Sequence, residues 1–163
     1  MMFEAYTVTF FGHRYVDQVT KIEYALDDII GKLLRGQEYV EFLLGRDGEF
    51  DLIVASCIKR CQKRIRDDNS SMTWVLPYPT ADLSKNIKEY EDYYDSIEIC
   101  EEASRSHPKV AITKRNQSMI DRSDLVICYV EHESGGAYKA MKYAEKTGKT
   151  VINIADAKTE ERV

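Results

Sequence analysis

Short runs of β-branched and aromatic residues alternate along this chain with longer segments whose apolar residues recur every three or four positions. Residues 5–11 are rich in strand formers, and the apolar residues between 19 and 34 follow at helical spacing. We predict strands at residues 5–11, 39–44, 72–76, 97–100, 125–130 and 150–154. We predict helices at residues 19–34, 50–61, 82–96, 114–122 and 137–146. This alternation favours a three-layer α/β/α domain with a mostly parallel sheet.

The length of the chain suits one domain. Its 163 residues contain no repeat, no low-complexity tract and no linker. Hydrophobic residues make up 44% and charged residues 31%, a balance that argues against disorder. We assign residues 1–155 to a single domain and residues 156–163 to a charged C-terminal tail.

The formal net charge of −5 bears on the partners of the protein, because an acidic domain has no broad positive field for nucleic acid. The basic run at 59–66 lies at the end of a predicted helix, where cations complement the helix dipole. Nucleic acid is therefore not an expected partner. No signal peptide opens the chain, and no apolar run reaches the ~18–20 residues that span a bilayer. We expect a cytoplasmic protein with no membrane partner.

The four cysteines, Cys57, Cys61, Cys100 and Cys128, form no CxxC pair. This spacing favours free, largely buried thiols in a reducing compartment. A zinc site needs further ligands that no spacing supplies. We therefore expect no metal and no bound cofactor.

Three glycine-bearing loops each join a predicted strand to a helix. They are Gly12-His13-Arg14, the loop from Gly45 through Arg46 to Gly48, and Ser134-Gly135-Gly136. In parallel sheets ligands bind beyond the carboxyl ends of the strands. Glycine lets a backbone approach a ligand closely, and helix starts suit phosphate. The alternative is that these are ordinary tight turns, since neither GxxxxGK[ST] nor GxGxxG is present.

Side chains near these loops are candidates for ligand contacts. Arg14 is placed to bind phosphate or ribose, or to form a surface ion pair. His13 is placed to bond the ligand or to cap a helix, and Asp51 to bind a ribose hydroxyl or to satisfy a helix dipole. Arg115 and Asn116 are predicted to open the helix at 114–122, where they can hold a phosphate or a base edge.

Glu131 and Glu133 flank His132 beside the last glycine turn and are the candidate catalytic residues. As a cluster these side chains can supply a general base. The alternative is that they belong to a solvated loop.

Several segments resemble the DUF1273 proteins, the YpsA and YoqJ type, within the SLOG superfamily named for the Smf/DprA and lonely-guy proteins. Residues 9–14 resemble the "GHR" opening of that family, and residues 44–51 its "GGAxGFD" segment. Residues 115–124 resemble its "RNxxMVDxSD" segment, and residues 134–137 its "GGT" turn. The motifs occur in order and span nearly the whole chain. The resemblance implies a Rossmann-like fold that binds a nucleotide or a nucleotide derivative, such as one derived from NAD.

Two residues depart from the family pattern. Arg46 stands where the second glycine of the middle pair is expected, which changes the backbone path or adds a guanidinium to the pocket. Ala137 replaces the threonine of the "GGT" turn and removes a hydroxyl from the start of a helix.

Three functions follow from the resemblance. The first is a binding module that senses or sequesters the nucleotide. The second is a phosphoribohydrolase that cleaves the N-glycosidic bond of a nucleoside 5′-monophosphate, as the lonely-guy branch does. That branch has the hallmark PGGxGTxxE, whereas Lys139 and Ala140 stand here where the acid is wanted. The third is a DNA-processing role, by analogy with the Smf/DprA branch. By analogy with related families, a homodimer is also expected.

Overall fold

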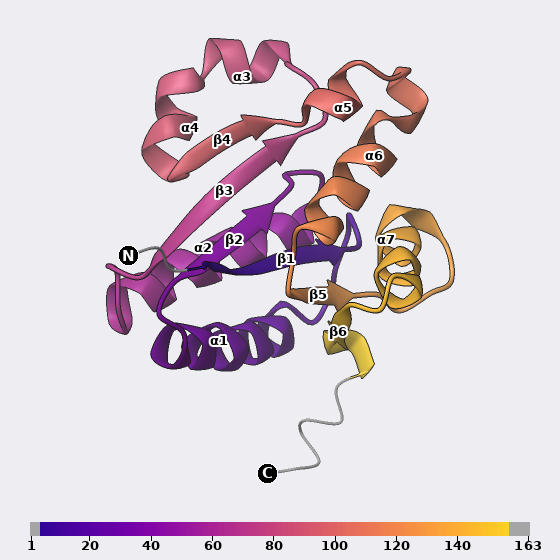
Figure 1. Ribbon diagram of the computed structural model, residues 1–163. Helices are drawn as coiled ribbons and strands as arrows, with labels where there is room; N and C mark the ends of the chain where they lie inside the picture. The colour runs from indigo at the N-terminus through magenta and orange to yellow at the C-terminus, as the bar shows by residue number, and fades with distance from the viewer. Residues whose placement is uncertain (1–3, 157–163) are drawn as a thin grey trace.

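The computed structural model describes residues 4–156 as a six-stranded sheet with the strand order β4-β3-β2-β1-β5-β6 (Figure 1). The strands are β1 (Tyr6–Gly12), β2 (Val40–Leu44), β3 (Ser70–Leu76), β4 (Ser96–Ile99), β5 (Leu125–Tyr129) and β6 (Thr150–Asn153). Every pair of neighbouring strands in this part of the chain is parallel. The predicted α/β class is confirmed, with a sheet that is parallel throughout.

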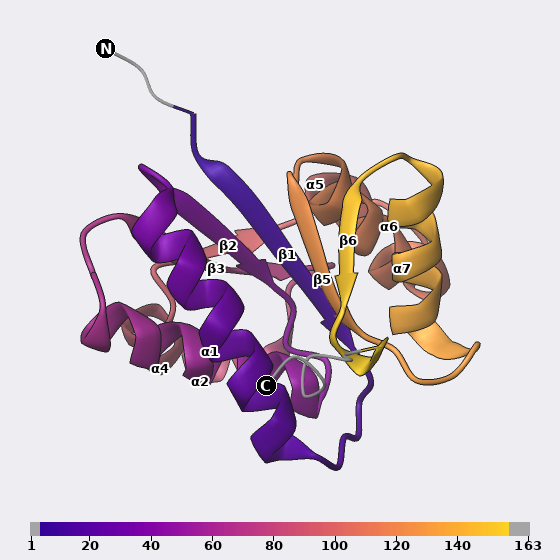
Figure 2. The same cartoon turned by 90° about the horizontal axis from the view of Figure 1, so that it is seen from below.

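Helices cover both faces of the sheet. They are α1 (Val19–Gly36), α2 (Glu49–Arg64), α3 (Ala81–Lys85), α4 (Ile87–Tyr93), α5 (Glu101–Ser104), α6 (Pro108–Asp121) and α7 (Gly135–Lys146), followed by the 3₁₀ turn η1 (Ile154–Asp156). Figure 2 shows α1 and α2 on one side of the sheet and α6 and α7 on the other. The fold is therefore a three-layer, Rossmann-like α/β/α arrangement.

The core has two parts, one under each helical layer. Residues of α1 and α2 pack on one face of the sheet, and residues of α6 and α7 pack on the other. All five residues of β5 are buried, because this central strand is covered on both faces. The edge strand β6 alternates exposed and half-buried residues, as an uncovered edge requires.

Two predicted helices have wrong boundaries. The helix predicted at 82–96 is two shorter helices, because Asn86 ends α3 and its side chain bonds back to Asp82. The helix predicted at 114–122 begins at Pro108, and the His107 side chain caps it by accepting the amide N–H of Lys109. Proline is well tolerated in the first turn of a helix, where no partner is needed for its missing N–H.

The strand order reverses beside β1, which is the feature that positions the site. The chain runs outward from β1 through β2 and β3 to β4, and then crosses back so that β5 pairs with the other side of β1. Such a switch point opens a crevice beyond the carboxyl ends of the two strands.

In the described part of the chain, no helix has the length and apolar character needed to cross a membrane. The predicted charged tail lies outside the described residues, except for Asp156 in the final turn.

Candidate functional site

A cavity of about 550 Å³ lies at the carboxyl ends of the central strands. Its lining comes from the loops after β1, β2 and β5 and from α2, α6 and α7. The lining residues are Phe11, Gly12, His13, Arg14, Tyr15, Asp47, Asp51, Ile112, Asn116, His132, Ser134, Gly135, Gly136 and Ala137. Residues of all three glycine-bearing loops or of the helices that follow them therefore meet at one cavity.

Two glycines allow the loops after β1 and β2 to pack together. A Cβ on Gly12 would lie 2.2 Å from the Phe50 ring, and a Cβ on Gly48 would lie 2.5 Å from Cα of Arg14. The amide N–H of Glu49 also donates to the Arg14 carbonyl, with a distance of 2.8 Å. Glycine is needed at both positions because no side chain fits there, and Gly48 supports the cavity without lining it.

The start of α7 forms another wall. Gly135 has φ of 89°, a left-handed conformation that favours glycine, and neither it nor Gly136 has any atom within 4 Å of where a Cβ would lie. The Ser134 side chain makes no cap hydrogen bond to this helix. The first amide groups of α7 have no hydrogen-bond partner among the described residues, and the helix dipole makes the space before them favourable for an anion.

Arg14 lines the same cavity. It is exposed, and its guanidinium has no hydrogen-bond or ion-pair partner among residues 4–156. Such a cation, in one cavity with helix amides that also have no partner in the described chain, suits a phosphate group.

His13 joins the end of β1 to the loop after β5. Its Nε2 accepts the amide N–H of Glu131 at 2.8 Å, so its proton sits on Nδ1. Its ring stacks on His132 with the centroids 3.9 Å apart. Burial and the neighbouring His132 lower the pKa of His13, which keeps its imidazole neutral.

Asp51 is a buried carboxyl in the first turn of α2 that lines the cavity. Its Oδ2 accepts the amide N–H of Asp47 at 2.9 Å. Burial, followed by the nearby Asp47 carboxylate, raises the pKa of Asp51 to about 7. The cavity thus contains a carboxyl group that holds its proton at a much higher pH than an ordinary aspartate.

Arg115 and Asn116 do not open a helix, contrary to the prediction. Both lie within α6, and Arg115 is only 1% exposed. Its guanidinium pairs with Asp47 and donates to the Val75 carbonyl, so its role is to hold the cavity wall. Asn116 lines the cavity and accepts from Arg115 through Oδ1, which leaves its NH₂ group without a partner in the described chain.

The other predicted site residues lie beside the cavity and not on its lining. Arg46 turns away, donating to the Tyr94 hydroxyl at 3.1 Å and lying over the ring of Tyr90. Gly45 is buried against Asp47 and Arg115. The predicted catalytic residues Glu131 and Glu133 are exposed and do not line the cavity.

Three lining residues lie outside the predicted loops and clusters: Phe11, Tyr15 and Ile112. Asp47 belongs to the predicted loop between Gly45 and Gly48, and His132 lies between Glu131 and Glu133, although neither was singled out as a ligand contact. Ile112 could not be predicted, because it belongs to a stretch whose helix was not recognised. In the part of the chain described here, no group of three or more His, Cys, Asp or Glu side chains is arranged to hold a metal ion.

No family model and no curated protein matches this chain. Among solved structures, the chain is similar to the X-ray structure of DNA processing protein A (DprA) from Streptococcus pneumoniae, with a TM-score of 0.64 and 15% sequence identity. The match covers 90% of this chain and 49% of that one, so the chain spans about half the length of the protein it matches. The similarity shows that this chain and the matched part of DprA share a fold.

Proposed function

We propose that this protein binds a nucleotide or a nucleotide derivative, such as one derived from NAD, and senses or sequesters it as a SLOG-type module. One observation carries the proposal. The loops after β1, β2 and β5 contribute to one cavity at the switch point of the sheet, which is also lined by Arg14 and the start of α7, whose guanidinium and amide groups have no partner among residues 4–156. Its volume of about 550 Å³ is within the usual range for small-molecule sites.

The charges of the cavity support a ligand with two chemically different ends. Arg14 and the start of α7 favour an anionic group such as phosphate. Asp51 and the free NH₂ group of Asn116 offer hydrogen bonds to a neutral polar group. A nucleoside phosphate combines both features in one molecule.

Binding without turnover is favoured because the expected catalytic glutamates lie off the cavity lining. The first turns of α7 carry Lys139 and Ala140, so they bring no acid to the phosphate end. N-glycosidic hydrolysis is the second candidate function, because Asp51 is a carboxyl inside the cavity with a pKa of about 7.

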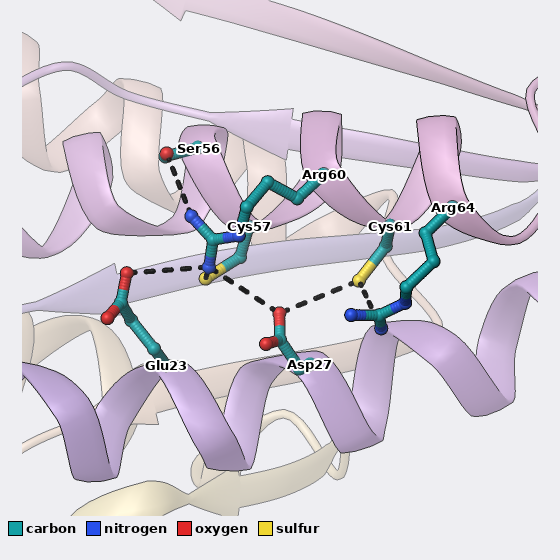
Figure 3. A network of polar contacts seen from close by, with 7 residues as sticks. All are labelled: Glu23, Asp27, Ser56, Cys57, Arg60, Cys61 and Arg64. Carbon is teal, nitrogen blue, oxygen red and sulfur yellow. Dashed lines mark hydrogen bonds and ion pairs between the residues drawn. The ribbon is translucent and has the colours of Figure 1, made fainter.

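A DNA-processing role receives less support from the surface of α2. Figure 3 shows Arg60 between α2 and α1, where it pairs with Glu23 at 3.4 Å and Asp27 at 3.7 Å. Lys59 donates to the Tyr93 carbonyl at 2.8 Å. Arg60 and Arg66 of the basic run at 59–66 therefore pair with carboxylates, which reduces the attraction of this surface for phosphate backbones.

Nucleotide binding can be tested with AMP, GMP and ADP-ribose. We expect each binding nucleotide to shift the amide resonances of Gly135 and Gly136, and calorimetry to give the affinity. Gly136→Asp places a negative charge at the phosphate end and meets no atom within 4 Å, so it should weaken binding at least tenfold without unfolding the protein.

The matched control is Gly36→Asp, which adds the same charge at an equally open glycine at the far end of α1. It should leave the affinity unchanged. Equal affinities of the two variants, or no binding by any of the three nucleotides, would contradict the proposal. If chromatography detects free base released from a nucleotide, the protein is a hydrolase and not a binding module.

Membership of the DUF1273 family, a cytoplasmic location and a homodimer belong to the same proposal. Light scattering of the purified protein tests the dimer, for which a mass near twice 18.8 kDa is expected.

A further inference from the structure

Asp51 is anchored at one oxygen only. It lies in the first turn of α2, is 8% exposed and lines the cavity. Its Oδ2 accepts the amide N–H of Asp47. An oxygen that accepts from an amide is the carbonyl-like oxygen of a protonated acid, so a proton on this group belongs on Oδ1.

The second carboxyl oxygen of Asp51 is left without a protein partner within the described chain. Oδ1 forms no hydrogen bond with any described residue. Within residues 4–156 the only fully buried side-chain polar atom without a partner is Oδ1 of Asn69, so Oδ1 of Asp51 is not sealed inside the protein. Because Asp51 lines the cavity, that oxygen is available to a molecule bound there.

No cation compensates Asp51 directly. The guanidinium of Arg115 donates to Asp47, Val75 and Asn116, and none of its hydrogen bonds reaches Asp51. The titratable and charged groups around Asp51 are Asp47 in the β2–α2 loop, Arg115 in α6, Tyr94 after α4, His13, Arg14 and Tyr15 after β1, and His132 after β5. Burial and the Asp47 charge outweigh the attraction of Arg115, which raises the pKa of Asp51.

We propose that Asp51 binds the nucleotide as a neutral carboxylic acid, with its Oδ1 hydroxyl donating to an acceptor atom of the ligand, so that ligand and proton bind together. This inference rests on the proposed function and deepens it. The negative charge of a phosphate in the same cavity further disfavours a second negative charge on Asp51. The acceptor is a carbonyl oxygen, a ring nitrogen or a phosphate oxygen.

The proposal differs from the sequence-based interpretation of Asp51 as a carboxylate that accepts from a ribose hydroxyl. A carboxylate acceptor would make binding stronger as the pH rises, whereas a neutral donor makes it weaker. The two roles therefore predict opposite pH dependences of affinity, which makes them separable by one titration.

The test measures the affinity for AMP by calorimetry at pH 7, 8 and 9, in Tris and in HEPES. In this range the phosphate is a dianion, because its second pKa is about 6, and His13 is neutral because burial lowers its pKa. We expect the affinity of the native protein to fall by up to about tenfold per pH unit. We also expect the observed binding enthalpy to differ between the two buffers by an amount that corresponds to the uptake of up to one proton.

Asp51→Asn is the decisive variant, because its amide accepts from Asp47 through the oxygen and donates through NH₂ at every pH. It should bind AMP with no pH dependence and without proton uptake, and at pH 9 it should bind at least about tenfold more tightly than the native protein. Asp28→Asn, which removes an exposed carboxylate of α1 outside the cavity, should behave like the native protein.

Two readouts separate failure of this inference from failure of the proposed function. An AMP affinity that is constant or rises from pH 7 to pH 9 would overturn the inference while nucleotide binding stands. A titration of the Asp51 ¹³Cγ resonance in the ligand-free protein with a midpoint near 4 instead of near 7 would overturn it without any ligand. Absence of binding by AMP, GMP and ADP-ribose overturns the proposed function, and the inference with it.

Discussion

Asp47 and Arg115 lie 68 positions apart in the chain and form an ion pair that ties the loop after β2 to the middle of α6. Arg115 is 1% exposed and Asp47 is 45% exposed, so the pair joins a buried cation to a half-solvated anion. The pair fixes one wall of the cavity and places the Asp47 carboxylate near Asp51.

Asp47→Asn should therefore destabilise the protein by about 2 kcal/mol. This is less than the 3–5 kcal/mol typical of a fully buried pair, because Asp47 is half exposed. Urea unfolding gives the free energy. Neutralising Glu98, which pairs with Arg122 across an exposed surface, should change it by less than about 1 kcal/mol. Equal losses in the two variants would contradict the structural role given to Asp47.

Asp51→Asn should stabilise the ligand-free protein at pH 8 and leave it unchanged at pH 4. The folded pKa of about 7 is above the ordinary value of 3.8, so the folded state binds more protons between these values. The native protein thus loses stability as the pH rises through this window, by about 1.4 kcal/mol per unit of pKa difference. Urea unfolding at pH 4, 6 and 8 tests this, and a constant difference between the variants would contradict it.

His13 should make the folded protein less stable as the pH falls, which is opposite to the effect of Asp51. Burial and His132 lower its pKa, so the unfolded state takes up a proton first as the pH falls below 6.5. Stability conferred by His13 is present above pH 6.5 and is lost as the pH falls through the lowered folded pKa. In the Asp51→Asn background, His13→Gln should flatten this slope. Long-range ¹⁵N spectra of the native protein should show the Nδ1–H tautomer, and an Nε2–H tautomer would disprove the bond from Glu131.

Gly12→Ala should destabilise the protein by about 1–3 kcal/mol, because its methyl group would overlap the Phe50 ring on α2. Gly136→Ala meets no atom within 4 Å and should leave the thermal midpoint nearly unchanged. Calorimetric melting of both variants checks the prediction. Similar midpoints for the two would show that the loop after β1 is not held against α2 as described.

Alkylation at pH 8 should modify Cys100 first. Cys57, Cys61 and Cys128 are buried, and burial raises the pKa of Cys57 and of Cys128 to about 12. Their thiols remain protonated and shielded in the folded protein. Mass spectrometry after iodoacetamide treatment should find one fast site and three slow ones, and rapid labelling of Cys57 would contradict this assignment.

The ends of the strands were predicted to within one residue, except for β3, which begins two residues earlier, at Ser70. Strand-forming residues bounded by glycine or proline are a local signal, and the prediction needed nothing else. The helix start at Pro108 was missed because a proline is compatible with both a loop and a first helical turn, and the His107 cap becomes visible only in three dimensions.

The meeting of the three strand-end loops at one cavity was predicted from the same reasoning. Strand-end loops must meet at the carboxyl edge of a parallel sheet, so Gly12, Arg14 and Gly136 could be grouped from order along the chain alone. The direction in which each side chain points could not be predicted in this way. Arg46 turns to Tyr94 and Arg115 turns to Asp47 because those partners come from distant segments.

The contacts between α1 and α2 reduce the net positive charge of the surface that residues 59–66 form. Counted along the chain, residues 59–66 form a dense block of positive charge. In three dimensions Glu23 and Asp27 reach Arg60 from the neighbouring helix, so a polyanion approaching that face would meet a lower positive potential than the sequence suggests. Retention on a heparin column depends on this remaining potential and should be weak at moderate salt. Retention should increase when Glu23 and Asp27 are replaced by their amides.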